Sequence, residues 1–235
     1  MKNLSRIIPC LFVLLFVAGC ASTKVSDRQQ LVTGPLPRPD HILVYDFVAT
    51  PADVPSDSSL AGQNPADSKP QTAEQIETGK KVGAEIAEKL VELVRAMGMP
   101  AEHVSTAQPQ INDIVLRGYL LSVNEGSEAK RIGIGLGAGA SELKVAVEGF
   151  QMTAQGLRKL GSGSTDAGGS KGPGGAVGLV TLIATHNPAG LIISGGMKVY
   201  GEASGKSKIE GRADQTATEI ADILKKRFQE EGWIK

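Results

Sequence analysis

The chain has 235 residues, of which 25 are basic and 25 acidic, so its formal net charge is zero. Nucleic-acid-binding domains usually present a clustered basic surface, and this balance therefore argues against a nucleic-acid partner. Aromatic residues make up 4% of the chain and 29 residues are glycine, so a core has to be built mainly from aliphatic side chains.

The first twenty residues have the pattern of an exported precursor. Two basic residues precede an apolar run over 7–17, and small residues lead directly into Cys20. The stretch resembles a bacterial lipobox, which predicts a signal peptide over 1–19 and a Cys20 that carries lipid such as palmitate. The run is well short of the roughly 20 residues that a transmembrane helix needs. By analogy with bacterial sorting rules, Ala21 favours the outer membrane, with the domain facing the periplasm.

Cysteine content bears on how the domain is held together. The only other cysteine, Cys10, would leave with the signal peptide, so the mature chain is expected to have no disulfide. Packing or assembly then has to stabilise it. Residues 20–40 are polar, with prolines at 35, 37 and 39, and are predicted to form a flexible to semi-extended tether after the lipidated cysteine.

A single domain is expected over 41–235, beginning with a strand, a loop and a helix. Residues 41–48 predict a buried strand, in which Asp46 fits a strand end or cap better than a site carboxylate. Residues 50–70 contain four prolines and predict a long exposed loop or a disordered insertion. Over 72–97, apolar residues recur at helical spacing behind a capping-box sequence, Thr72-x-x-Gln75, and Gly98 supplies a stop.

Two further strands are expected, over 111–123 and 141–154. In the second strand, apolar residues alternate with Lys144 and Glu148, which places those two on the opposite face of the sheet. Between the two strands lies a glycine-alternating run over 131–140, which fits a bare backbone where another element approaches closely.

The C-terminal part predicts a second amphipathic helix over 208–231. Its basic trio at 225–227 lies near the helix C-terminus, where the macrodipole favours cations, and lipid binding is the alternative role for it. Trp233 follows Gly232, and it is expected to fold back onto the last helical turn.

Residues 161–199 form a Gly-rich apolar segment. Residues 161–175 predict a loop, and two apolar arms, 176–185 and 189–199, follow on either side of a break at 186–188. Neither arm is long enough to span a membrane as a helix, but about ten residues is the length of a tilted membrane strand. Gly-rich helical turns, or strands buried in the domain, fit the arms equally well.

Two glycine motifs invite a nucleotide-binding interpretation, and neither fits. Gly133-x-Gly135-x-x-Ala138 satisfies the loose dinucleotide pattern, but a strand follows it where a helix should open. Residues 201–207 resemble a phosphate loop with three residues between the glycines, where that loop needs four. We therefore expect no bound cofactor.

Catalytic and metal-binding patterns are also missing from the sequence. The three histidines, His41, His103 and His186, are widely scattered, without metal-ligand spacing. The chain has no G-x-S-x-G motif, and the mature chain has no thiol besides Cys20. We therefore expect no metal site and no enzymatic activity, with lipidation of Cys20 as the one residue-specific chemical role.

The order of these parts resembles a known family. A lipobox, a strand over 42–47, a helix, Leu116-Arg-Gly-Tyr-Leu120 and the glycine run over 133–139 leading into a strand at Ser141 together resemble the bacterial lipoproteins grouped as domain of unknown function 4410, over about residues 40–232. That family has no assigned activity. More distantly, the order is similar to the periplasmic domain of the curli secretion channel lipoprotein, whose channel hairpins would correspond to 131–140 or 176–199.

These observations predict an α+β fold: a small, mostly antiparallel sheet with two amphipathic helices on one face and a Gly-rich apolar insertion. The expected function is that of a non-catalytic outer-membrane lipoprotein, anchored through Cys20, that binds a protein partner or scaffolds an envelope assembly. The alternative is a subunit of a membrane-inserting or secretion-channel oligomer that uses residues 176–199. A homo-oligomer is compatible with both.

Overall fold

The computed structural model describes residues 24–32, 34–61, 71–124, 142–168 and 206–235. Its sheet has six strands in the order β1-β6-β5-β4-β2-β3. Three neighbouring pairs are antiparallel, and β2 runs parallel to both β3 and β4. The strands are β1 (Lys24–Gln30), β2 (Ile42–Tyr45), β3 (Ala101–Val104), β4 (Ile114–Asn124), β5 (Glu142–Thr153) and β6 (Gly156–Gly168). The expected α+β fold with a mostly antiparallel sheet is confirmed.

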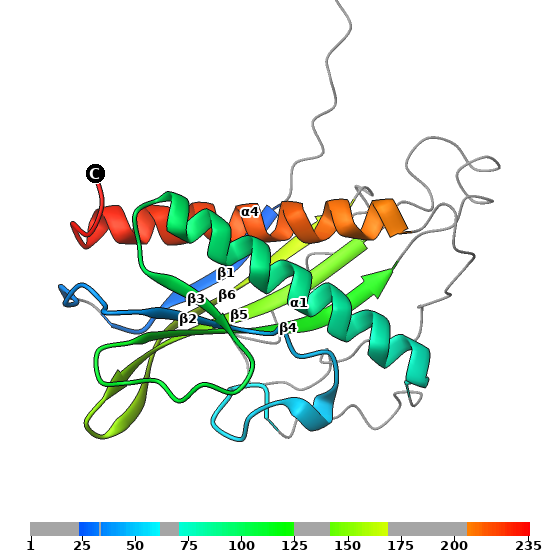
Figure 1. Cartoon of the computed structure of the whole chain (residues 1–235), viewed down its shortest axis with the longest axis horizontal. Helices are drawn as coiled ribbons and strands as arrows, with labels where there is room; N and C mark the ends of the chain where they lie inside the picture. Colours follow the sequence, from blue (N-terminus) through cyan, green and yellow to red (C-terminus); the bar gives the residue numbers. More distant parts are fainter. Residues whose placement is uncertain (1–23, 33, 62–70, 125–141, 169–205) are drawn as a thin grey trace, which may run out of the picture.

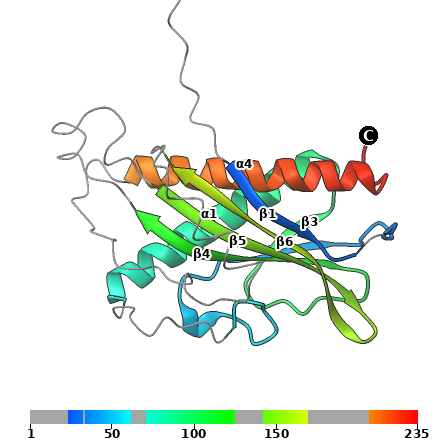
Figure 2. The same ribbon diagram turned by 180° about the vertical axis from the view of Figure 1, so that it is seen from behind.

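Two long helices cover one face of this sheet (Figure 1). Helix α1 (Ala73–Ala96) packs against β2, β3 and β4, whereas α4 (Lys206–Glu230) packs against β5 and β6. Seen from behind, the strands lie in front of α1 (Figure 2). The main core lies between the two layers and is aliphatic, as the composition predicts; fully buried members include Val44, Ile86, Leu90 and Val145.

Helix α1 begins and ends as its sequence predicts. The Thr72 side chain accepts a hydrogen bond from the Gln75 amide, and the Gln75 side chain accepts one from the Thr72 amide, which completes the capping box. After the helix, Gly98 has a φ of +81°, a conformation that favours glycine.

Within the helix, the carbonyl of Gly83 accepts a hydrogen bond from the Phe47 amide at 3.3 Å. A Cβ at Gly83 would overlap the Phe47 carbonyl, so this glycine sets the close approach of α1 to the segment after β2.

The C-terminal end of α4 also forms as expected. Gly232 has a φ of +72°, and the amide of Trp233 donates back to the Phe228 carbonyl at 2.8 Å. The Phe228 and Trp233 rings lie 5.5 Å apart, centroid to centroid. The indole nitrogen of Trp233 donates to the Leu36 carbonyl at 3.1 Å, so the end of α4 is tied to the N-terminal part of the chain.

The predicted flexible tether over 20–40 is wrong for residues 24–32 and 34–40. Residues 24–30 form β1, the edge strand, which pairs antiparallel with β6. The following residues contact the domain: Leu36 is buried, and its amide donates to Glu231 Oε2 at 2.7 Å. An edge strand is held by backbone hydrogen bonds and needs no alternation of apolar residues. The polar sequence of β1 therefore resembles that of a flexible linker.

Two loop predictions also need correction. Residues 161–168, expected to be part of a loop over 161–175, belong to β6, whose backbone pairs on both sides and therefore tolerates Gly and Ser. In the loop over 50–70, residues 51–53 form a 3-10 helix, and Ser58 and Leu60 are buried against the sheet face opposite the helices, so the expected exposure is wrong there. Residues 62–70, the glycine run over 131–140 and the apolar arms over 176–199 lie outside the described residues.

Candidate functional site

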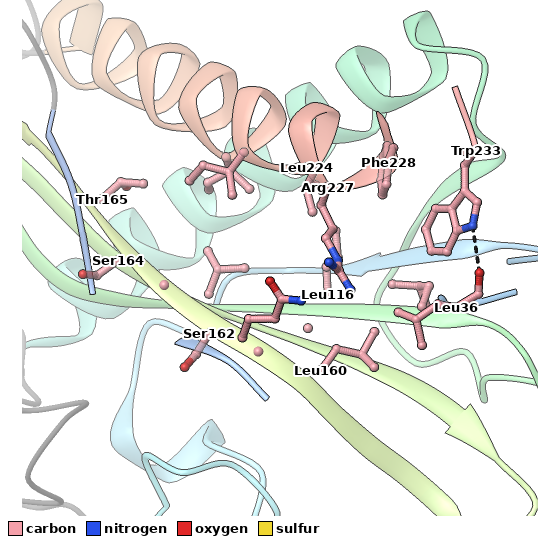
Figure 3. Close-up of a pocket in the computed structure, with 18 residues that line it drawn as sticks. Leu36, Leu116, Leu160, Ser162, Ser164, Thr165, Leu224, Arg227, Phe228 and Trp233 are labelled. Atoms are coloured by element: carbon pink, nitrogen blue, oxygen red, sulfur yellow. Dashed lines mark hydrogen bonds between the residues drawn. The ribbon is translucent and has the colours of Figure 1, made fainter. Parts of the chain in front are cut away.

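The strongest candidate for a binding site is an apolar slot between α4 and the sheet (Figure 3). It has a volume of about 160 Å³. Its helix side carries Ile220, Leu224 and Phe228, and its floor is formed by residues of β4, β5 and β6. Figure 3 shows Thr165 at one end of the slot and Phe228 with Trp233 at the other.

The slot exists because β6 has glycine at two successive positions that face α4, Gly161 and Gly163. In the β5–β6 register, Val147 lies opposite Gly163 and Gly149 opposite Gly161, so both pairs point towards the helices. A Cβ placed at Gly163 would meet nothing within 4 Å. The space that a valine or leucine would fill on a neighbouring strand is therefore left open under α4.

Few polar groups line this slot. Thr165, which lies opposite Val145, is 2% exposed, and within the described part of the chain its hydroxyl has no hydrogen-bond partner. Arg227 lies over the slot and is held by ion pairs with Glu230, at 3.4 Å, and with Glu231. Gln30 of β1 is exposed and also lines the slot, so the slot reaches the molecular surface beside β1.

A second, polar cleft lies at the carboxyl end of β2, where Asp46 is placed. His103 Nε2 lies 2.6 Å from Asp46 Oδ1, and the Ser105 hydroxyl donates to Asp46 Oδ2 at 3.1 Å. Lys80 and Arg117 also line this cleft, which has a volume of about 590 Å³. A serine nucleophile would need to bond to the histidine that activates it, whereas here both side chains bond to the same carboxylate. The arrangement fits the structural role expected of Asp46.

A buried carboxylate, Glu148, fastens the loop over 54–61 to the outer face of the sheet. Glu148 is 1% exposed and accepts hydrogen bonds from the Ser58 hydroxyl at 2.7 Å and the Tyr119 hydroxyl at 2.9 Å. The amide and hydroxyl of Ser59 and the Lys159 ammonium donate to its other oxygen. Burial alone would raise the pKa of Glu148, but the hydrogen bonds from Lys159, Ser59 and Ser58 together hold that pKa below its usual range.

The same environment acts on Tyr119. Burial, reinforced by the negative charge of Glu148, raises the pKa of the Tyr119 hydroxyl above its usual range. The hydroxyl therefore stays protonated and serves as a hydrogen-bond donor to Glu148. The network satisfies every oxygen of the carboxylate, and its role is to hold the loop in place.

The other predicted site residues are separated or lie outside the described residues. His41 lies 3.1 Å from Asp113 at the start of β2, away from His103 at the other end of the parallel strands. Within the described ranges, no group of three or more His, Cys, Asp or Glu residues could hold a metal ion. Cys20, His186 and residues 201–205 are outside those ranges. Of the basic trio at 225–227, Arg227 forms ion pairs with Glu230 of α4 and with Glu231, which follows the helix.

Sequence reasoning missed the apolar slot and the buried state of Glu148. The alternation in β5 correctly places Glu148 on the face opposite the helices, but nothing in that pattern says that a distant loop covers it. The slot depends on which residues of β6 face α4, and the Gly/Ser sequence of β6 carries no alternation from which to read this. No helix among the described residues is long and apolar enough to cross a membrane.

Comparison with known proteins gives one family and a distant structural likeness. A family profile described as "Domain of unknown function (DUF4410)" matches residues 42–186, which confirms the resemblance to that family; the resemblance to the curli channel lipoprotein stays a prediction. No curated protein matches. A solved PelC dodecamer from Paraburkholderia phytofirmans is 14% identical, with a TM-score of 0.36, over 72% of this chain and 93% of that one. A single-substitution variant of the same dodecamer is also 14% identical, with a TM-score of 0.34, over 72% and 92%.

Proposed function

Because the chain belongs to the DUF4410 family, whose description assigns no function, we propose its role from its own sequence and geometry. It is a non-catalytic lipoprotein of the bacterial outer membrane, anchored through Cys20, whose α+β domain faces the periplasm and binds a protein partner. The observation that carries this proposal is the lipobox pattern that ends at Cys20.

The position of β1 supports an anchoring role for that cysteine. Four Cα–Cα steps separate Cys20 from Lys24, the first residue of β1, and an extended chain covers at most about 14 Å in that length. Because β1 is paired with β6, a lipid on Cys20 would hold the whole sheet close to the membrane surface. A long tether would leave the domain free to diffuse, whereas this arrangement fixes it beside the bilayer.

The polar groups of the described residues support a binding role over catalysis. The Ser105 and His103 side chains are both engaged by Asp46, and the most deeply buried acid, Glu148, is saturated by donors from the loop and the sheet. A general acid or base has to be free to exchange a proton with a substrate. These groups instead hold the fold together.

Lipidation is tested with a matched pair of cysteine variants. Cells expressing the wild type, Cys20→Ser or Cys10→Ser are labelled with an alkyne analogue of palmitate, and the purified protein is assayed for label. We expect label on the wild type and on Cys10→Ser, and none on Cys20→Ser. Label on Cys20→Ser, or its absence from the wild type, contradicts the proposal.

The alternative function is that of a subunit of a membrane-inserting or secretion-channel oligomer. A further variant distinguishes it from the lipid-anchored, partner-binding role. Residues 1–20 are replaced by a signal peptide that is cleaved without lipidation, and the membranes are washed at alkaline pH. Release of the protein supports the lipid as the sole anchor. Retention that is abolished by deleting residues 176–199, together with ion conductance in liposomes, would favour the oligomer. Crosslinking in intact cells followed by purification then identifies the protein partner.

A further inference from the structure

The geometry of the apolar slot points to a ligand, and we propose that it binds a single acyl chain through its hydrocarbon part and its carbonyl or carboxylate oxygen. The oxygen lies at Thr165, and the chain runs under α4 towards Phe228 (Figure 3). This binding does not depend on lipidation of Cys20 and goes beyond the proposed anchoring and partner-binding role.

The dimensions of the slot fit an elongated apolar group. The floor from Gly161 to Thr165 spans four strand steps, about 13 Å at 3.3 Å per residue. The roof from Ile220 to Phe228 spans eight helical steps, about 12 Å at 1.5 Å per residue. An apolar cavity of about 150 Å³ can stay dry and take up a benzene-sized molecule, so a slot of about 160 Å³ has room for a comparable apolar group. The elongated shape of the slot favours the first carbons of an acyl chain over a ring, and the rest of a palmitoyl chain would extend beyond the slot.

Among the described residues that line the slot, the hydroxyls of Ser162 and Thr165 have no hydrogen-bond partner. Ser162 lies opposite Glu148, whose side chain faces away from the helices, so the hydroxyl on the α4 side of the sheet is that of Thr165, and it selects the chemistry of the ligand. The hydroxyl of Thr165 is buried at 2% exposure and lacks a partner among the described residues. Leaving a buried hydroxyl unpaired is unfavourable, and a ligand oxygen at this end of the slot would accept its hydrogen bond. A pure hydrocarbon would leave the hydroxyl unpaired, whereas an acyl carbonyl or carboxylate would satisfy it.

The slot also has an entrance and is kept open by its sequence. Gln30, on the exposed edge strand, lines it, so a chain can enter from the surface beside β1. At Gly163 an added Cβ meets no atom within 4 Å, although protein interiors are normally close-packed. The bare position therefore preserves a volume that any larger residue would occupy.

The test uses the full chain reconstituted in phosphatidylethanolamine vesicles. One arm adds palmitic acid with a photoreactive diazirine on its chain, and the other arm contains phosphatidylethanolamine with the same chain. After irradiation, labelled peptides are identified by mass spectrometry. We expect labelling of the peptide that contains Ile220 and Leu224. Labelling by the free acid alone assigns the slot to free fatty acids, and labelling by the phospholipid assigns it to bilayer lipid. Labelling of this peptide in neither arm overturns the proposal.

Paired variants separate slot binding from nonspecific labelling. We expect Gly163→Leu, which fills the slot, to reduce labelling at least tenfold. Gly211→Leu is the matched control, because Gly211 is exposed on α4 with nothing within 4 Å of an added Cβ, and it should label within twofold of the wild type. Wild-type labelling of a folded Gly163→Leu variant overturns the proposal.

A second substitution removes only the hydroxyl. Thr165→Val keeps the shape of the side chain, and we expect it to weaken labelling about fivefold while the melting temperature of the ligand-free protein stays equal or rises, because an unpaired buried hydroxyl has been removed. If circular dichroism shows that Gly163→Leu does not fold, Thr165→Val alone tests the proposal. Undiminished labelling of Thr165→Val would show that Thr165 does not contact the ligand and would overturn the assigned chemistry.

Discussion

The buried carboxylate of Glu148 gives the sharpest test of how the loop over 54–61 is held to the sheet. We expect Glu148→Gln to lower the free energy of unfolding by about 2–3 kcal/mol at pH 7. The hydroxyls of Ser58 and Tyr119 can turn to accept from the new amide nitrogen. The Lys159 ammonium can only donate, so it faces the amide oxygen, and its hydrogen bond exchanges a charged acceptor for a neutral one. Hydrogen bonds to charged groups contribute about 1.5–3 kcal/mol and neutral ones about 0.5–1.5 kcal/mol, so the loss falls mainly on the bond with Lys159.

The assay is urea unfolding followed by far-UV circular dichroism, because both helices and the sheet contribute to that signal. The side chain of Lys159 is 22% exposed, and water can therefore solvate its charge in the variant, which keeps the loss below that of a fully buried broken pair. Glu102→Gln, on the exposed side of β3, is the matched control and should change stability by less than about 0.5 kcal/mol.

The pH dependence follows from the same carboxylate. Its folded-state pKa lies below the ordinary value of 4.5, because the hydrogen bonds from Lys159, Ser59 and Ser58 outweigh the effect of burial. As the pH falls, the unfolded state therefore takes up the proton first. The stabilisation by Glu148 is fully present above about pH 4.5 and is lost as the pH falls through the folded-state pKa. Equal stability of wild type and Glu148→Gln at pH 7, or a difference that persists through this window, would refute the reasoning.

Three further substitutions test local packing and capping by the same urea assay. In Gly118→Ala, the new Cβ would overlap the ring of Phe47, and we expect a loss of about 1–3 kcal/mol or more; wild-type stability would contradict this packing. Thr72→Ala removes the capping box of α1 and should cost about 1 kcal/mol, with unchanged stability arguing against the cap. Trp233→Ala removes the contact with Phe228 and the hydrogen bond to Leu36, and because the side chain is half-buried we expect about 2 kcal/mol, measured against Trp233→Phe, which keeps the ring contact.

The elements that the sequence predicts well are those whose side chains form the hydrophobic core. Helix α1 has an apolar stripe, a capping box and a terminal glycine, and each of these leaves a separate signal in the sequence. Strands β4 and β5 are rich in apolar residues on the face that α1 and α4 cover. The fold class follows from these elements, since two amphipathic helices and several strands can share only a few layer arrangements.

The candidate sites were harder to predict because they depend on contacts between distant segments. Glu148 alternates with apolar residues and therefore reads as a solvent-facing side chain, yet Ser58 and Ser59 from 90 and 89 residues earlier cover it. Asp46 reads as a strand-end residue, and its bonds to His103 and Ser105 agree with that interpretation. For both Glu148 and Asp46, the local sequence pattern indicates where the residue lies in the sheet but does not indicate which side chains it bonds to.

Two strands that sequence analysis does not predict, β1 and β6, both contribute residues to the apolar slot. β1 and β6 are held by backbone hydrogen bonds, so their side chains are free to be polar or absent, and the alternation that normally reveals a strand is missing. The same freedom allows glycine at 161 and 163, which opens the slot, and glutamine at 30, which lets it reach the surface. A strand without an apolar face reads as a linker or a low-complexity loop, and an empty volume behind it leaves no sequence pattern. Sequence analysis therefore misses the slot and these two strands for the same physical reason.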